Sequence, residues 1–567
     1  MTDHALSPTK TLDRLRVIRN AYAADLEREK RDLLSALSAK APIAANRLRA
    51  LHDDLLFLLA FPGAAETRRV AMRMRADLAR HLDRLESAER GRFDDTGVAG
   101  SVTRHLYPFP VAQWIAKRAR GEAEIDWRNF ADPSLLDHAL RGILCASEGE
   151  AFDSGDISTR AWVRLARPRD ARSDLEWLLD AMAALPAARA DELWAMSEAP
   201  IAWRLAASKW SVTRNFLNGT PVIMRRAMRR PPPDPARRIM EPLREIERLK
   251  PAQARRVIEV ARAALAARCR EVVAISYPNP EEVYWCDLGE GVALAVIGVA
   301  PWHRLNLETN TGYLLLSNGV PIGYGGVTPL FRQANTGINI FDPFRGGEAA
   351  FLWVEMLRAF RTLYGVSRFI INGYQFGEGN AEAINSGAYW FYYRLGFRPD
   401  NAARLKLAER EAARLRRAKA PPSSKATLKA LAAGDLTLDL PGSEPADLFP
   451  ERLLTAASLH ATRQLAGTPA TTRDGAERWV AEKAAEALGI ASMRRWLAAE
   501  RRSFARLAPI VGAVPEIGAW PAAERNPIVE MMRAKGRPQE RDFALASGRN
   551  QKFFHALARR LDEPGRA

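Results

Sequence analysis

The sequence is poor in the residues that build metal sites and disulfide frameworks. Its 567 residues include only three cysteines and eight histidines. Cys145, Cys269 and Cys286 are too few and too scattered for a disulfide framework or a thiolate metal site, and the histidines show no ligand spacing. We therefore expect no metal site, and a reducing, cytoplasmic setting.

Long apolar runs are also lacking. No run approaches the roughly 20 apolar residues that a membrane-spanning helix needs, and the first ten residues contain no apolar signal core. We therefore expect no membrane partner. A hydrophobic content of 47% and a charged content of 27% are typical of a globular chain, and the length favours three or four domains.

Positive charge is abundant, but it is unevenly spread. Residues 281–399 carry 8 Lys+Arg and 10 Asp+Glu, for a net −2, whereas residues 1–280 carry 47 and 37, for +10, and residues 400–567 carry 29 and 20, for +9. The basic flanks are consistent with attraction to nucleic acid or another polyanion. They are equally consistent with solvated helical faces, and we favour this second interpretation because acids are interleaved with the bases.

The two flanks have helical patterns. We expect a helical N-terminal region over residues 1–230, with room for two subdomains, whose tryptophans form a core rather than a stacking platform. A proline-rich linker at residues 229–235 precedes a helical connector over residues 237–280. After the central part, we expect a charged helix and a linker over residues 401–424 and a helical C-terminal domain over residues 425–567.

The central part alternates between strand and helix patterns. Asn318-Gly319 is the strongest hairpin signal in the sequence, because both residues tolerate the positive φ of a tight turn. We expect strands over residues 271–277, 292–299, 313–317, 321–327, 336–341 and 367–372, and helices over residues 348–364 and 380–395. This order indicates a mixed sheet with helices on its faces, and hence an α+β protein.

One motif stands out within the last of these helices. Asn385, Ala388 and Tyr392 are spaced by three and four residues, which would place them on one helical face, and Gly396 follows where a left-handed C-cap is easiest. An amide, a small residue and a phenol on one helical face can together bind an extended ligand and donate a proton to it. The alternative is that Tyr392 is packed among the neighbouring aromatic residues 389–393.

This spacing resembles that of the GNAT (N-acetyltransferase) superfamily, and residues 290–400 resemble the rest of its domain. The resemblance implies a GNAT-like domain over residues 281–400 that uses acetyl-CoA or another acyl-CoA. It implies that Asn385 contacts the pantetheine arm and that Tyr392, as general acid, protonates the departing thiolate. It also implies that a backbone N–H within residues 339–341 holds the oxyanion.

The resemblance extends to the loop that would bind the pyrophosphate of CoA. It implies that the cofactor-binding residues are Ile340, Phe341, Arg345, Gly346, Gly347, Glu348, Ala349 and Ala350, at the start of a helix whose free N–H groups favour an anion. Glu348 departs from the family pattern, which has glycine there. Either this carboxylate points to solvent in the first helical turn, or the slot does not take CoA in the usual way.

The expected activity is acyl transfer from acyl-CoA to an amine of a small molecule or a protein, by direct attack in a ternary complex, since no Cys/His or Ser/His pair is evident. Glu308 and Asp342 are candidates for the general base, as are His303 and Tyr324. Two alternatives stay open. One is a tRNA-dependent aminoacyl transferase on the same fold, and the other is a catalytically degenerate binding or scaffold protein.

Overall fold

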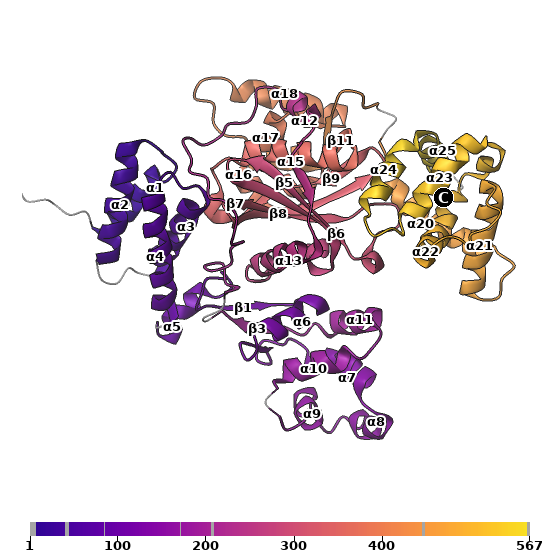
Figure 1. Cartoon of the computed structure of the whole chain (residues 1–567), viewed down its shortest axis with the longest axis horizontal. Coiled ribbons are helices and arrows are strands. Elements are labelled where there is room, and N and C mark those ends of the chain that lie inside the picture. The colour runs from indigo at the N-terminus through magenta and orange to yellow at the C-terminus, as the bar shows by residue number, and fades with distance from the viewer. Residues whose placement is uncertain are drawn as a thin grey trace, which may run out of the picture.

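The protein is an α+β molecule in which a large mixed sheet lies between helical regions (Figure 1). The computed structural model describes residues 7–39, 45–83, 85–170, 172–205, 209–444 and 448–563. Within these residues no helix is both long enough and apolar enough to cross a membrane.

The chain begins with a bundle of amphipathic helices whose leucines form a common core. The bundle comprises α1 (Pro8–Ile18), α2 (Ala24–Ala39), α3 (Ala45–Ala60), α4 (Ala65–Asp83) and the single turn α5 (Ser87–Arg90). The end of α3 is fixed to the central sheet, because the Ala60 carbonyl accepts hydrogen bonds from the side chains of Ser317 and Asn318. The predicted Asn318-Gly319 turn is therefore a docking point as well as a hairpin.

The next part of the N-terminal region is not all-helical, and that expectation is wrong. Three short antiparallel strands in the order β1-β3-β2 lie among its helices. The strands are β1 (Val102–His105), β2 (Ala123–Ile125) and β3 (Ile201–Arg204), and the helices are α6 (Phe109–Arg118), α7 (Asp137–Ile143), α8 (Ala146–Asp153), α9 (Thr159–Ala166), α10 (Asp174–Met182) and α11 (Ala187–Ser197). Strands of three or four residues carry too little period-2 signal to be distinguished in a helical context. Trp114, Trp194 and Trp203 are buried in this core.

The central sheet has the strand order β12-β13-β11-β9-β8-β7-β6-β5-β4 in the described residues, with β10 also paired to β8. Its strands are β4 (Ile246–Arg248), β5 (Pro278–Gly289), β6 (Val292–Val299), β7 (Thr311–Ser317), β8 (Val320–Leu330), β9 (Gln333–Thr336), β10 (Asn339–Ile340), β11 (Arg368–Ile371), β12 (Arg398–Pro399) and β13 (Leu436–Asp439). Every pairing is antiparallel except that of β9 with β11.

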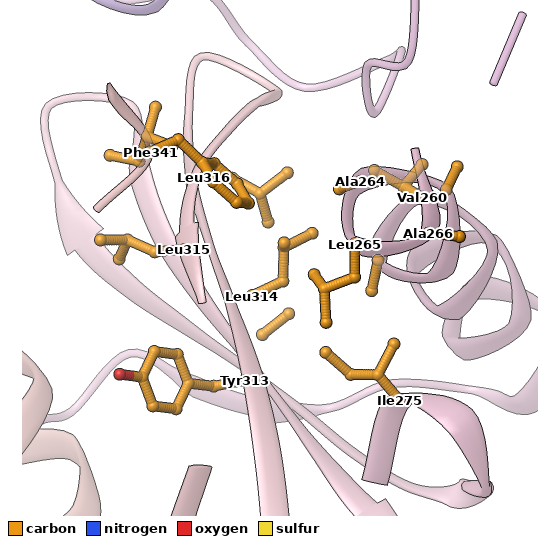
Figure 2. Packing of buried hydrophobic residues seen from close by; sticks show 14 of the residues in the cluster. Val260, Ala264, Leu265, Ala266, Ile275, Tyr313, Leu314, Leu315, Leu316 and Phe341 are labelled. Carbon is orange, nitrogen blue, oxygen red and sulfur yellow. The ribbon is translucent and has the colours of Figure 1, made fainter. Parts of the chain in front are cut away.

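Helices cover both faces of this sheet. Along β7 the side chains alternate, so that Leu314 and Leu316 point toward α13 (Pro251–Ala266), while Tyr313 and Leu315 point to the other face (Figure 2). There the Tyr313 ring packs 5.6 Å from that of Phe360 in α15 (Ala349–Tyr364). The eight residues of β6 are all buried, as expected for a strand in the middle of a sheet that is covered on both faces.

The sheet takes strands from segments where the sequence predicts helix. The expected connector over residues 237–280 contains α12 (Pro235–Met240) and α13, but it also supplies β4. The strand expected over residues 271–277 is wrong, because the chain forms the single helical turn α14 (Val273–Ser276) there. After α18 (Ala402–Leu415) and α19 (Lys425–Ala432), β13 returns to pair with β11.

The last part of the chain is a helical domain with its own core. It consists of α20 (Glu451–Ala466), α21 (Arg473–Leu488), α22 (Ala498–Val511), α23 (Ala522–Ala534), α24 (Arg541–Arg549) and α25 (Gln551–Asp562). Phe331, from the turn between β8 and β9, inserts into this core beside Phe449 and Phe554. Short 3-10 turns elsewhere are η1 (Gly91–Phe93), η2 (Pro133–Leu136), η3 (Pro301–His303), η4 (Asp342–Phe344), η5 (Gly373–Phe376) and η7 (Pro515–Ala519).

Candidate active site

In the central sheet, the pairing between two neighbouring strands, β9 and β11, ends after a short stretch. β9 pairs in parallel with β11 at three positions only, the last being Asn335 opposite Ile370. Beyond that point β10 stays with β8, where Asn339 lies opposite Tyr324, while β11 ends at Ile371 and turns into η5. In the described chain the other edge of β10 therefore has no strand partner, and the sheet splits along this line.

Two tyrosines meet the backbone where β9 gives way to β10. The ladder to β8 is interrupted at Gly337 and Ile338, although the register on either side is the same. The Tyr313 hydroxyl donates a hydrogen bond to the Gly337 carbonyl. From the other side, the backbone of Ile338 hydrogen-bonds the Tyr392 hydroxyl. The Gly337 carbonyl and the Ile338 N–H, at the interruption of the ladder, are thus each hydrogen-bonded to a tyrosine hydroxyl.

Tyr392 combines the two environments that the sequence suggested as alternatives. Its residue is 3% exposed, and its ring lies among those of Trp353, Phe376 and Phe397, with centroids 5.8 to 6.2 Å away. Its hydroxyl nevertheless reaches the split in the sheet at Ile338. Burial raises the pKa of Tyr392 far above its usual value, and the hydrogen bond from Ile338 opposes this only in part. The phenol is therefore protonated at neutral pH.

Asn385 is not on the same helical face as Tyr392, and the predicted helix over residues 380–395 is wrong. Gly387 adopts a φ of 65° and divides this segment into α16 (Ala381–Ser386) and α17 (Ala388–Arg394). Asn385 is exposed on the first helix, and Tyr392 is buried on the second. Gly396 does take a positive φ of 101°, after the end of α17.

The loop before α15 holds the residues that the family resemblance assigns to the pyrophosphate. Arg345 is 58% exposed and forms ion pairs with Asp342 at 3.1 Å and with Glu382 of α16 at 2.9 Å. Its Nε also donates to the Ile340 carbonyl. Arg345 thereby links the loop to α16, on the other side of the split, and Asp342 is engaged by this arginine.

Glu348 does not point to solvent, and that interpretation is wrong. Its side chain is fully buried as the N-cap residue of α15. Arg225 donates to both carboxylate oxygens at 3.2 Å, and Arg229 donates through its backbone N–H at 2.7 Å and through Nη2 at 3.3 Å. The two guanidinium groups therefore neutralise the carboxylate that departs from the family pattern, and they also pair with the half-exposed Glu290, whose Oε2 lies 2.6 Å from Arg225 Nη1 and 3.9 Å from Arg229 Nε.

A cavity of about 510 Å³ opens at the start of α15. Its wall includes Arg226, Arg229 and Arg230. These arginines belong to residues 225–230, a segment that is bound to the start of α15 through Glu348 and that we call the strap. Gly347 and Ala350 line it on the helix side. The N–H groups of Gly347, Ala349 and Ala350 donate to no acceptor within the described chain. This geometry favours an anion.

The remaining base candidates are not gathered at one place. Tyr324 lies at the split, stacked on Phe341 with ring centroids 5.3 Å apart, and burial raises its pKa. Phe341 is covered in turn by the Arg268 guanidinium at 3.9 Å. His303 instead faces Asp191 of α11, with Nε2 3.4 Å from Oδ2.

Glu308 lies beside the C-terminal domain, where its carbonyl accepts a hydrogen bond from the Lys535 ammonium at 2.8 Å. Burial raises the pKa of Glu308, and Lys535 opposes the shift. The neighbouring Thr309 N–H bonds Pro329 on β8, six residues from the Gly323 that pairs with β10. Six residues of strand span roughly 20 Å, so Glu308 is at the opposite end of β8 from the split.

Sequence reasoning missed several residues of this region. Tyr313 and Gln375 both meet Gly337, where a Cβ atom would lie 2.8 Å from the Gln375 side chain. Arg225 and Arg229 hold Glu348 across more than a hundred residues. The glycine at 337 is the one local signal, since it permits the close approach of a side chain to the backbone.

The sequence matches no family model, and comparison with curated proteins and with solved structures gives no significant match either. Over the described residues, no three His, Cys, Asp or Glu side chains are placed to hold a metal ion.

Proposed function

We propose that the protein is an acyl-CoA-dependent N-acyltransferase that passes an acyl group, acetyl in the first instance, directly to an amine. The observation that carries the proposal is the split between β10 and β11, with the Tyr392 hydroxyl at its wall and the start of α15 beside it. A strand edge without a strand partner offers backbone hydrogen bonds to a thin, extended donor, and the order of strand, loop, helix and phenol supports the family resemblance.

The start of α15 is suited to the phosphates of the donor. Gly347 and Ala350, whose N–H groups have no acceptor in the described chain, line a cavity with three arginines, and the carboxylate in that lining, that of Glu348, is held by Arg225 and Arg229. The net charge at the cavity is positive, and the helix dipole adds to it. In this proposal Arg226 and Arg230 bind phosphate oxygens, while Arg345 stays with its carboxylate partners.

Tyr392 is the proposed general acid. The hydrogen bond from Ile338 uses an acceptor site of the hydroxyl, so the hydroxyl proton is not spent on it. As the amine attacks the thioester carbonyl, the carbon–sulfur bond breaks and negative charge gathers on sulfur. A neutral, buried phenol stabilises that charge and supplies a proton to it. Tyr324 is the proposed relay for the proton that leaves the amine, because it is the candidate that lies at the split; its hydroxyl oxygen accepts that proton while its own hydroxyl proton passes to solvent water.

Calorimetry with acetyl-CoA and with acetyl-pantetheine, which lacks the nucleotide phosphates, tests the donor site. We expect acetyl-CoA to bind, and we expect the Arg226→Ala/Arg230→Ala variant to weaken it about tenfold or more while leaving acetyl-pantetheine unchanged. An absence of heat at millimolar acetyl-CoA would leave the proposal without a donor.

Thiol release from acetyl-CoA in the presence of a panel of primary amines tests the acid. We expect Tyr392→Phe to lower kcat about a hundredfold or more, because general acids contribute on that scale, with donor affinity retained. Tyr389→Phe is the matched control, since Tyr389 is buried in the same helix and its hydroxyl has no hydrogen-bond partner among the described residues. Equal activity of the two variants would remove Tyr392 from this role.

A further inference from the structure

A second and larger cavity lies between the N-terminal region and the sheet, and its lining shares no residue with the strap or the split. It measures about 1330 Å³ and is formed by α6, α10, α11, α13 and η3. We call it the α11–α13 cleft. Small-molecule pockets usually measure about 300 to 1,000 Å³, so this cleft has room for a longer ligand.

Aromatic rings line the mouth of the α11–α13 cleft. Trp302, on η3, is 73% exposed, whereas Trp114 in the same lining is 7% exposed. Next to it, the His303 ring lies on that of Tyr277, with centroids 3.6 Å apart. Asp191 fixes both, because it accepts a hydrogen bond from the Tyr277 hydroxyl and faces His303 Nε2. The solvent-exposed indole of Trp302, next to this aromatic pair, offers a surface on which a ligand ring can stack, and no side chain of the described residues covers it.

The carboxylates of the α11–α13 cleft are already engaged. Each has a partner in the chain: Glu176 with Arg120, Asp180 with Arg172, Glu192 with Arg189, Glu259 with Arg118, and Asp191 with Tyr277 and His303. The four carboxylates that face an arginine offer little repulsion to an anionic ligand, whereas Asp191 keeps its charge beside the Tyr277 hydroxyl.

Three cations in the same lining are not matched by carboxylates. Lys117, Arg255 and Arg262 form no ion pair with a carboxylate in the described residues. Arg262 is held at the wall, because its Nε and Nη2 donate to the carbonyls of Ile275 and Ser276 at 3.1 and 2.8 Å. The cleft thus offers three positive groups beside a stacking surface.

We propose that the α11–α13 cleft binds a short segment of single-stranded nucleic acid, with a base on Trp302 and phosphates on Lys117, Arg255 and Arg262. Proteins bind single strands by this combination of stacking aromatics and a cationic groove. The net charge of +17 for the whole chain favours the encounter at longer range. The site is independent of the proposed acyl transfer, and either can fail without the other.

Fluorescence anisotropy with a labelled ten-nucleotide oligo(U), on the full chain, tests the proposal. We expect binding at 50 mM salt that weakens with a log–log salt slope of about −2, since each single-strand phosphate contact contributes about −0.7. Trp302→Ala should weaken binding about fivefold to a hundredfold, which is the range for one stacked base, and Trp302→Phe should restore most of it. Arg255→Gln should make the salt slope shallower by about 0.7.

Arg473→Gln supplies the matched control, because it removes one exposed positive charge on α21, away from the cleft (Figure 1). We expect it to leave the affinity almost unchanged. The proposal is overturned if oligo(U) does not bind at 100 µM protein, or if Trp302→Ala and Arg255→Gln do no more than Arg473→Gln. It is also overturned if free UMP binds as tightly as the strand, because the ligand would then be a mononucleotide.

Discussion

At the scale of single residues, one charged side chain, that of Glu348, lies where the resemblance to the GNAT superfamily predicts an uncharged residue. Glu348 stands where a glycine is the family's choice, and its meaning depends on Arg225 and Arg229. Both arginines are more than a hundred residues from Glu348. The sequence therefore shows that Glu348 departs from the family pattern, but not that two arginines neutralise it. The role of Tyr392 stays a prediction, and the interruption of the ladder at Gly337, beside which its hydroxyl lies, could not be predicted from the sequence.

The carboxylate of Glu348 gives the first stability prediction. Glu348→Gln removes the buried carboxylate of this cluster and leaves Arg225, which is fully buried, and Arg229 with only the half-exposed Glu290 as a counter-charge. Removing one partner of a buried ion pair costs about 3–5 kcal/mol of unfolding free energy, and we expect a loss of that size in guanidinium denaturation.

Glu382→Gln is the control for this measurement, because it removes a carboxylate from an arginine pair that is exposed on both sides. Exposed pairs contribute about 0–1 kcal/mol. A loss for Glu348→Gln as small as that for Glu382→Gln would mean that the strap does not lock α15.

At the scale of elements, long periodic segments were predictable and short or interrupted ones were not. The strands at 292–299 and 367–372 and the helix at 348–364 fall within a residue or two of β6, β11 and α15. Residues 271–277 have strand composition but form a helical turn, because the chain must bend there between α13 and β5. Composition gives no information on such a constraint.

Gly387 decides the geometry of the helix pair that carries the motif. Its φ of 65° is a conformation that costs an L-residue about 1–2 kcal/mol, and no atom lies within 4 Å of a Cβ placed there. We therefore expect Gly387→Ala to lower the unfolding free energy by about 1 kcal/mol through backbone strain alone.

Gly149, inside α8, offers the opposite case with equal space around it and no positive φ. Gly149→Ala should raise stability by about 0.5–1 kcal/mol through helix propensity. If Gly387→Ala proves as stabilising as Gly149→Ala, the two helices α16 and α17 join without cost, and Asn385 then shares a face with Tyr392 as the spacing suggested.

At the scale of the whole molecule, the C-terminal helical domain is attached to the sheet through buried charge. Arg304 donates to the carbonyls of Lys535, Arg537 and Pro538. Glu282 on β5 accepts the Arg541 N–H at 2.8 Å and lies 3.7 Å from Arg304. Composition alone predicted a helical domain here, but it contained no indication of which face would meet the sheet, since the contacts join residues more than 200 positions apart.

This interface predicts a dependence of stability on pH. The pKa of Glu282 is raised to about 7, chiefly by burial and also by the Glu540 carboxylate, while Arg304 and hydrogen bonds from the backbone at Glu540 and Arg541 oppose the shift. The folded chain therefore holds a proton at Glu282 between about pH 4.5 and pH 7, where the unfolded chain has lost it. The stabilisation from this group is fully present below the unfolded pKa and is lost as pH rises through the folded one.

Denaturation of the native chain and of Glu282→Gln at pH 5 and pH 8 isolates the contribution of Glu282 to the free energy of unfolding. The effects of the other titrating groups cancel when the pH responses of the two proteins are subtracted. The neutral amide mimics the protonated acid at both pH values. We expect the native chain to lose up to about 3 kcal/mol relative to Glu282→Gln on going from pH 5 to pH 8. Because Lys535 and Glu540 are paired, the loss should appear as loosening of α24 from β5, measured at pH 8 as lower hydrogen-exchange protection along α24 in the native chain than in Glu282→Gln. An equal pH response of the two proteins would show that Glu282 is charged in the folded state and that Arg304 neutralises it.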